Sequence, residues 1–401
     1  MGKFVVEEHV QGKRMVLNMG PQHPSTHGVL RLVLELDGER VLRCVPHIGY
    51  LHTGIEKLSE EHNYTKNITH YPRMDYLAPM NNELAYCLAV EKLIDEEVPA
   101  RADYIRVAMH EVTRCMSHLF WIGTHAMDIG AATVFLYAVQ EREHLLDLYE
   151  MVGGQRMMTS YIRVGGLSAD IPDGFDEYTR SWALKFPKLV DMIHGLLTKN
   201  PIWRMRTQEV GYIDRETCLS YGLMGPLLRA VGIEQDLRKD VPYCRYEEFD
   251  FHVPVREEGD VFARYEVRMT EMYEAAKLVL QALDKIKDTP PGDYMWQSDH
   301  FAPPRRSGVD ADIEKSIHHF KYWTEGFKPP AGEAYASVES SKGELGFYVV
   351  SDGSPRPLRV KVRGPSFVNL SALPAMVEGG LIADVAAIIG SIDIVLGEVD
   401  R

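Results

Sequence analysis

The segment Gly20-Pro-Gln-His-Pro-Ser-Thr-His-Gly28 holds the residue types of this chain that are best suited to chemistry. It places two histidines, His23 and His27, between prolines and glycines. Proline and glycine interrupt helices and strands, so a stiff loop is expected here. Histidine gains or loses a proton near neutral pH more readily than other side chains. From this segment alone, a structural hydrogen-bonding role and a functional role are equally open. A metal site would need further ligands at defined spacing, and no such His/Cys cluster follows.

Two other segments carry candidate groups. In Tyr71-Pro-Arg73-Met-Asp75-Tyr76, a tyrosine can donate a proton or a hydrogen bond to a carbonyl, although packing at the start of a helix is the simpler role. Asp128 lies in an apolar stretch between two expected helices, where a carboxylate must pair or shift its pKa. It can cap the next helix or serve as the counter-ion of a histidine. We find no phosphate-binding loop, dinucleotide fingerprint or nucleophile elbow.

The composition limits the partners. The net charge of −14 and the pI of about 5.6 argue against nucleic acid and against electrostatic attachment to anionic lipid. The longest apolar runs are too short to span a membrane, and the first residues lack a secretion signal. A membrane role would therefore depend on other subunits. The five cysteines form no Cys-x-x-Cys pair and are expected to be free, buried thiols.

The elements that would position these groups form an α+β fold. Residues 29–36 alternate as a strand, Asp37-Gly38 is a hairpin turn, and residues 41–45 return. Helices are expected from Asn81 or Asn82 to residue 98, from about residue 103 to beyond His125, and over residues 131–152, 175–197 and 260–287. The second of these carries a polar stripe of His110, Arg114, Ser117, His118, Trp121 and His125. Two-residue periodicity returns from residue 333, with strands 344–351 and 358–363. We expect a β-containing unit at 1–70, a helical bundle at 71–330, and a hairpin with an apolar tail at 331–401.

Motifs along the whole chain resemble those of the D subunit of NADH–quinone oxidoreductase, respiratory complex I. They are Gly20-Pro-Gln-His-Pro-Ser-Thr-His-Gly-Val-Leu-Arg31, Pro46-His-Ile-Gly-Tyr-Leu-His-Thr-Gly54-Ile-Glu-Lys57, Ser351-Asp-Gly353, Arg359-Val-Lys-Val-Arg363, Pro365-Ser-Phe, Ala386-Ala-Ile-Ile-Gly390 and Gly397-Glu-Val-Asp-Arg401. This family is related to the large subunit of nickel–iron hydrogenases, so the resemblance implies a hydrogenase-like fold. The two Cys-x-x-Cys pairs that hold nickel there are missing at the matching segments, Arg73 to Ala78 and Asp393 to Glu398. A thiolate-bound nickel site therefore cannot form.

The resemblance implies roles for five residues. His27 and Tyr76 match the residues that hydrogen-bond the two carbonyls of a quinone, and Asp128 matches the acid that pairs with that histidine. Arg73 matches an arginine beside the four-iron cluster of the neighbouring B subunit, while His23 belongs to the loop of the quinone cavity. Where many relatives carry a histidine beside that cluster, this chain has Met158.

The implied function is reduction of quinone, coupled to proton translocation, at the end of an electron path from NADH. The chain itself would bind no metal or cofactor, because NADH, FMN and the four-iron cluster belong elsewhere in the complex. Its partners would be the B and C subunits and the membrane subunit of the quinone channel, on the cytoplasmic side of a bacterial cell membrane. Whether the quinone is ubiquinone or menaquinone stays open. The alternatives are a hydrogenase-type catalytic subunit, disfavoured by the missing cysteines, and a structural scaffold.

Overall fold

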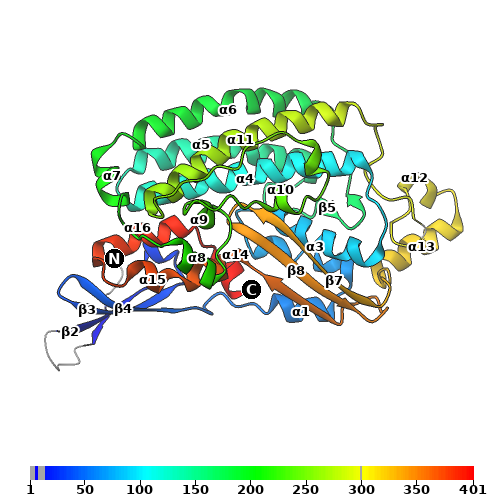
Figure 1. Cartoon of the computed structure of the whole chain (residues 1–401). Coiled ribbons are helices and arrows are strands. Elements are labelled where there is room, and N and C mark those ends of the chain that lie inside the picture. Colours follow the sequence, from blue (N-terminus) through cyan, green and yellow to red (C-terminus); the bar gives the residue numbers. More distant parts are fainter. Residues whose placement is uncertain (1–4, 8–13, 299) are drawn as a thin grey trace.

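Four long helices form the upper layer of the molecule in Figure 1. The computed structural model describes residues 5–7, 14–298 and 300–401. The long helices pack side by side and are α4 (Ala100–Asp128), α5 (Ala132–Gly153), α6 (Phe175–Leu197) and α11 (Val261–Lys287). Their bounds lie within three residues of those expected from the periodicity. Gly154 ends α5 with a positive φ of 70°. The sequence thus predicted the bundle correctly.

An antiparallel sheet lies at the N-terminal end of the chain. Its strands follow chain order and are β1 (Val5–Glu7), β2 (Arg14–Met19), β3 (Arg31–Asp37) and β4 (Arg40–His47). Asp37 pairs with Arg40 across the turn, which confirms the predicted hairpin. Strand β2 was not predicted, although it brings Met19, and hence the His-containing loop, to the edge of β3.

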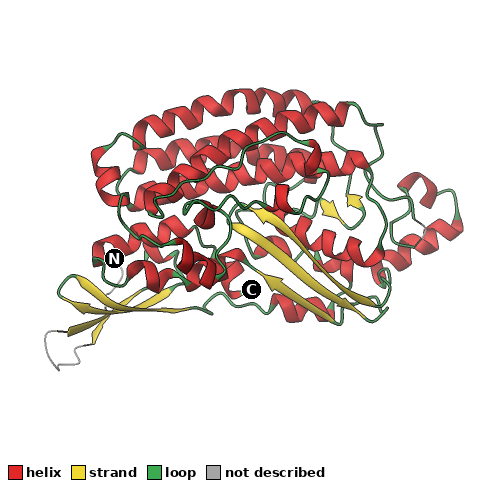
Figure 2. Ribbon diagram, in the orientation of Figure 1, coloured by secondary structure: helices red, strands yellow, loops and turns green. Residues whose placement is uncertain are grey.

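A second antiparallel sheet lies in the C-terminal part, drawn as long arrows in Figure 2. Its order is β7 (Gly332–Ser340), β8 (Gly343–Ser351) and β9 (Arg359–Arg363). The predicted hairpin is confirmed as β8 and β9, and β7 extends it to three strands. Because β7 and β8 pack on α3, this sheet joins the helical core.

Helix α3 (Pro79–Ile94) differs from the prediction at both ends. It begins before Asn81, because Pro79 occupies the first turn, where its missing N–H leaves no hydrogen bond unmade. Asn81 and Asn82 are buried inside the helix rather than capping it. It ends at Ile94, and the next residue, Asp95, adopts a left-handed conformation with φ 61°. The helix end expected from Pro99 was therefore four residues too late.

Two hydrophobic clusters hold these elements together. One joins the helices to the C-terminal sheet, and the other joins β2–β4 to short helices near residues 213–231 and 370–399. All five cysteines are free and buried, as predicted. Within the described residues, no helix combines the length and apolar character that a membrane span requires. The division into three units stays a prediction.

Short helices and minor strands complete the chain. They are α1 (Ile55–Glu61), α2 (Tyr64–Asn67), η1 (Pro24–Thr26), η2 (Tyr71–Arg73), β5 (Ile162–Arg163), β6 (Gly166–Leu167), α7 (Pro201–Thr207), α8 (Arg215–Tyr221), α9 (Pro226–Arg229), α10 (Leu237–Asp240), η3 (Tyr246–Glu248), α12 (Arg306–Val309), α13 (Ile313–Thr324), α14 (Pro365–Ser371), α15 (Leu373–Val377), α16 (Ile382–Ile392) and α17 (Leu396–Asp400). The predicted apolar tail is thus mainly helix α16.

Candidate functional site

The loop before β3 is a 3-10 turn, η1, that carries His27 at its end. His23 precedes the turn, and its Nδ1 accepts a hydrogen bond from the backbone N–H of Ser25 at 3.2 Å. The Thr26 hydroxyl is buried and donates to the His23 carbonyl at 2.9 Å. His27 itself has φ 55°, a left-handed conformation that is unfavourable for a residue with a Cβ. His23 and Thr26 thus fix the turn, and the turn fixes His27.

The imidazole of His27 is oriented by the C-terminal part of the chain. Its Nδ1 lies 3.0 Å from the carbonyl oxygen of Ile394. A carbonyl only accepts hydrogen bonds, so Nδ1 carries the proton and Nε2 is left to bind another group. His27 is exposed, yet the surrounding protein desolvates its ring enough to lower the pKa; the Ile394 carbonyl opposes this effect and Lys342 adds to it. Neutral His27 therefore presents an acceptor at Nε2.

Asp128 is the last residue of α4 and is half-buried, so the expectation that it lies between two helices was wrong. Burial raises the pKa of its carboxyl to about 6. Among the described residues it forms no ion pair or side-chain hydrogen bond, so the expected pair with His27 is not formed here. It does not cap α5 either, because Ala131 precedes that helix without a side-chain cap. The physical reason is that neutral His27, with its proton on Nδ1, offers only an acceptor at Nε2, and an ionised carboxylate cannot donate to it.

Tyr76 and Arg73 line one cavity of about 440 Å³. The remaining lining residues come from several other segments and are Leu51, Thr53, Ile55, Leu58, His70, Met158 and Gly397. Most of these side chains are apolar, and Arg73 is exposed at the cavity. His27 and Asp128 do not line it. The structure thus brings together Arg73, Tyr76 and Met158, which the resemblance had singled out from distant segments.

The Tyr76 hydroxyl has an unusual electrostatic environment. Burial raises its pKa, the charge of Asp75 raises it further, and the charge of Lys342 lowers it. Lys342 also acts on His27, so one buried ammonium group influences both predicted proton donors. No pattern in the sequence pointed to Lys342, because a lysine in the tight turn between β7 and β8 normally points to solvent.

The segment between β4 and α1, the second motif of the resemblance, is bound to the end of the chain. The Asp400 carboxylate accepts hydrogen bonds from the backbone N–H groups of Gly49 and Leu51 at 2.8 and 2.6 Å. His52 Nδ1 donates to the Asp400 carbonyl at 2.7 Å. Since Leu51 and Gly397 both line the cavity, these bonds hold two of its walls together.

His70 is a cavity residue that the sequence reasoning missed. Its Nε2 lies 3.0 Å from Nδ1 of His62, and the two rings stack at 5.0 Å. Burial, and then the neighbouring His62 and Arg73, lower the pKa of His70. The spacing of eight residues between these histidines matches no familiar ligand motif, so no sequence signal would have found the pair.

The predicted polar stripe of α4 is buried and lies against an ionic network. His118 Nε2 lies 2.8 Å from Glu271, and Glu271 accepts from Arg229 at 2.7 Å. Arg114 donates to Glu111 at 3.0 Å, and Arg238 donates to the same carboxylate at 3.1 Å. These charges are paired, as burial requires.

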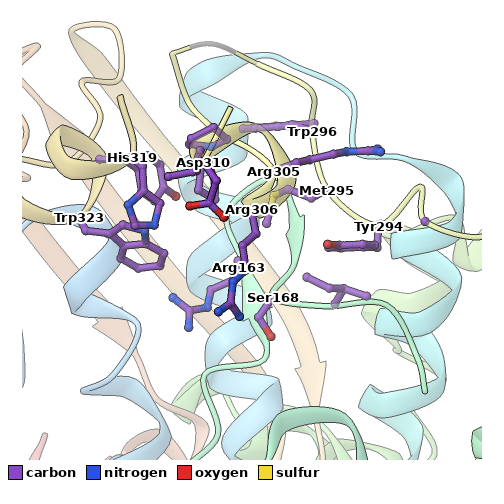
Figure 3. Close-up of a pocket in the computed structure, with 16 residues that line it drawn as sticks. Arg163, Ser168, Tyr294, Met295, Trp296, Arg305, Arg306, Asp310, His319 and Trp323 are labelled. Atoms are coloured by element: carbon purple, nitrogen blue, oxygen red, sulfur yellow. The ribbon is translucent and has the colours of Figure 1, made fainter. Parts of the chain in front are cut away.

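A larger cavity of about 690 Å³ lies elsewhere, beside α12 and α13. Figure 3 shows Arg163 and Arg306 near its centre, with His319 and Trp323 on one side and Tyr294 on the other. None of the residues singled out from the sequence lines this cavity. We therefore place the candidate site at the smaller cavity, where the hydroxyl of Tyr76 meets apolar walls.

Among the residues that the structure describes, no group of three or more His, Cys, Asp or Glu side chains could hold a metal ion. Residues 128–401 match the family model described as the 49 Kd subunit of respiratory-chain NADH dehydrogenase. A D subunit of NADH-quinone oxidoreductase from Roseiflexus sp. is 55% identical over 387 residues, which cover 96% of this chain and 93% of the relative. The D subunit of Geotalea uraniireducens is 55% identical over 387 residues, covering 96% and 98%. One from Chloroflexus aurantiacus is 52% identical over 399 residues, covering 99% and 97%. The chain belongs to the D subunit family of NADH-quinone oxidoreductase, the 49 kDa subunit family of respiratory complex I.

Proposed function

We propose that this protein forms the site where complex I reduces quinone, with the quinone headgroup in the cavity beside Tyr76. The observation that carries the proposal is the position of Tyr76 on the wall of a mainly apolar cavity, next to Arg73. Such a cavity suits an apolar ring that bears a few polar atoms. Tyrosine supplies a proton donor for one of its carbonyl oxygens.

Reduction of a quinone to a quinol takes two electrons and two protons. In our proposal, Tyr76 donates one proton to a quinone oxygen and His27 donates the other. Because Nδ1 of His27 is bound to Ile394, the second proton must leave from Nε2. His27 can therefore donate there only as an imidazolium ion. Negative charge developing on the quinone would favour that form, since an opposite charge raises the pKa of a histidine.

We assign Asp128 as the acid that responds to His27. Its unpaired carboxyl, with a pKa raised to about 6, can bind a charged imidazolium through a change of side-chain position. Discharge of His27 by proton transfer would then leave a carboxylate without a partner. We propose that this imbalance triggers the conformational changes that drive proton translocation.

In the assembled complex, electrons would come from the four-iron cluster of the B subunit, located beside the exposed Arg73. They would reach that cluster from NADH through FMN elsewhere in the complex. The C subunit and the membrane subunit of the quinone channel would be the other neighbours. The protein would be peripheral, on the cytoplasmic side of a bacterial cell membrane. A cation beside a cluster stabilises its reduced form, which is the role we assign to Arg73.

The test uses Tyr76→Phe and His27→Ala in the assembled complex. We expect quinone reduction to fall by about 100-fold or more, the lower range for loss of a positioned proton donor. Electron transfer from NADH to a soluble artificial acceptor should stay unchanged in the same preparations. Tyr212→Phe is the matched control, because Tyr212 is 59% exposed. Intact quinone reduction in Tyr76→Phe would refute the assignment, and loss of assembly without loss of turnover would favour a scaffold.

A further inference from the structure

A buried group of one lysine and three carboxylates lies behind Tyr76. We call Lys342, Asp75, Asp393 and Glu398 the lysine–carboxylate cluster. Lys342 Nζ lies 3.0 Å from Asp75 Oδ2 and 3.8 Å from Asp393 Oδ2. All four residues are buried, and Lys342, Asp75 and Glu398 have no accessible surface. Charges in such a place are costly to desolvate, so they must nearly balance one another.

The end of the chain brings Glu398 to this cluster. The backbone at Gly397 approaches the carbonyls of Arg73 and Met74 so closely that a Cβ atom would overlap them. Glu398 Oε2 accepts a hydrogen bond from the backbone N–H of Ser366 at 2.8 Å, while its Oε1 has no partner among the described residues. One oxygen of Glu398 is thus unpartnered inside the protein, in the residue next to a cavity wall.

The charges of the cluster do not cancel if every group is ionised. Besides Lys342, the cation that acts on Asp393 is Arg268 of α11, which also donates to the Ser391 carbonyl at 2.9 Å. Glu271 of α11 acts on Asp393 too, but Arg229 already pairs with it. The other polar groups at Lys342 are the hydroxyls of Ser117 and Ser341. Two cations therefore face three carboxylates, and one bound proton restores neutrality.

The position of the excess proton follows from the surroundings of each acid. Burial raises the pKa of Glu398 to about 7, with Asp75 raising it further and Ser366 and Lys342 opposing. Burial raises the pKa of Asp393 to about 6, against Lys342 and Arg268. Asp75 and Asp393 both lie within 4.0 Å of Lys342 Nζ, whereas Glu398 forms no ion pair among the described residues. Glu398 is therefore the group that holds the proton near neutral pH. A donor whose pKa lies close to the working pH can both release and regain its proton.

Charges of the cluster act on both predicted proton donors, Tyr76 and His27. Asp75 is the neighbour of Tyr76 in the chain, and the charges of both Asp75 and Lys342 act on the Tyr76 hydroxyl. Lys342 also acts on His27. A change of one proton in the cluster must therefore alter the proton affinity of Tyr76.

We propose that the lysine–carboxylate cluster stores one proton and returns it to Tyr76 after each quinone reduction. This inference rests on the proposed function. The Tyr76 O–H bond breaks as an O–H bond forms on one quinone oxygen, and the second proton comes from His27. The quinone takes its two electrons one after the other from the iron–sulfur cluster of the neighbouring subunit, which is reduced again between the two transfers. Glu398 then loses its proton, which passes by way of the Lys342–Asp75 pair to the Tyr76 oxygen. Glu398 is left as a carboxylate and recovers a proton from solvent. Glu398 thus acts on the reaction only through Tyr76 and does not touch the quinone.

The test is the pH profile of kcat for Glu398→Gln in the assembled complex at saturating quinone. The amide keeps the shape of the side chain but carries no transferable proton, so Tyr76 must be reprotonated from solvent. We expect kcat to fall by about 100-fold at alkaline pH and by less at acid pH, with KM unchanged. Small weak acids that diffuse into the site should restore part of the rate. Glu333→Gln, at the exposed end of β7, is the matched control.

A pH profile of Glu398→Gln that superimposes on the wild-type profile would overturn the proposal. Should that variant fail to assemble, Asp393→Asn removes the other raised acid, and its unchanged pH profile would have the same meaning. Infrared difference spectra of the wild-type complex across neutral pH provide an independent measurement. They should show a buried carboxylic acid that titrates, and its absence would also overturn the proposal. Tyr76→Phe is measured alongside: normal activity there refutes the proposed function itself, whereas impaired activity with a normal Glu398→Gln refutes only the proton store.

Discussion

Gly390 of α16 and His125 of α4 approach so closely that a Cβ atom on residue 390 would overlap Nδ1 of the imidazole ring. The contact is reinforced by Trp121, whose indole Nε1 donates to the Gly390 carbonyl at 2.6 Å. The His125 ring also stacks on Trp121 at 5.4 Å. Glycine at this position lets α16 lie against α4, and α16 leads directly to Asp393 and Ile394.

Gly390→Ala should therefore destabilise the protein although alanine favours helices. Overlap with a buried ring costs about 1–3 kcal/mol, which exceeds the gain in helix propensity. Gly195→Ala in α6 is the matched control, because nothing lies within 4 Å of its added Cβ, and it should be neutral or stabilising by up to about 1 kcal/mol. Chemical denaturation of the full chain measures both. Equal effects of the two substitutions would contradict the close approach.

Lys342→Met should destabilise the protein strongly at neutral pH. The substitution leaves Asp75, Asp393 and Glu398 without their central cation, and breaking a buried pair in this way costs about 3–5 kcal/mol. The loss should shrink in acid, where protonation removes the uncompensated charges. Lys361→Met is the control, since Lys361 is half exposed in its pair with Glu56 and should contribute less than about 1 kcal/mol. Similar losses of unfolding free energy in both variants would show that Lys342 is solvated.

Glu111→Gln should lower stability at neutral pH, by an amount that decreases as the pH falls. Burial alone would raise the pKa of Glu111, but Arg114 and Arg238 outweigh it and hold the value at about 2. Because this value lies below the usual 4.5, ionised Glu111 stabilises the fold above about pH 4.5 and loses its effect as the pH falls towards 2. Denaturation of both chains over this range measures the difference. Glu143→Gln, at an exposed pair with Arg156, should show no such trend.

Met158→His should make the redox potential of the neighbouring iron–sulfur cluster depend on pH. This prediction rests on the proposed place of that cluster beside Arg73. Met158 lines the cavity and cannot titrate, while the lowered pKa of His70 keeps that ring neutral at and above neutral pH. The wild-type potential should therefore change little with pH there. In Met158→His the slope should approach about 59 mV per pH unit, the limit for one proton per electron.

Potentiometric titration of the assembled complex at several pH values measures this slope. Met157→His is the control, because Met157 is 39% exposed and does not line the cavity. A steep slope already present in the wild-type complex would contradict the prediction, as it would place another titrating group beside the cluster.

The local pattern of the sequence was sufficient for the long elements. Helix α6 was predicted with its observed bounds, because a long apolar stripe of period 3.6 admits few alternatives. The hairpin of β3 and β4 followed from Asp37-Gly38 in the same way. Helix α3 was predicted to begin and to end too late. Two asparagines were taken as its cap, whereas Pro79 occupies its first position. The full-length resemblance identified the family, and the comparisons confirm it.

The roles of the candidate site residues stay predictions, but the structure shows where these residues lie. The sequence singled out Tyr76, Arg73 and Met158, but only the folded chain shows that they line one cavity. The resemblance implied a pair of His27 with Asp128, whereas in this structure His27 is bound to the Ile394 carbonyl. The reason is that hydrogen-bond partners far apart in sequence depend on how elements pack, which no local pattern encodes.

By itself, then, the sequence determined the α+β class, the positions of the long helices, the β3–β4 and β8–β9 hairpins, and the free cysteines. Tertiary structure alone decided which charges are buried. Lys342 lies in a two-residue turn and would be expected in water, yet the packing of that turn against Asp75 removes it from solvent entirely. A charge is solvated or desolvated by everything around it, so its chemistry is fixed only once the whole chain has folded.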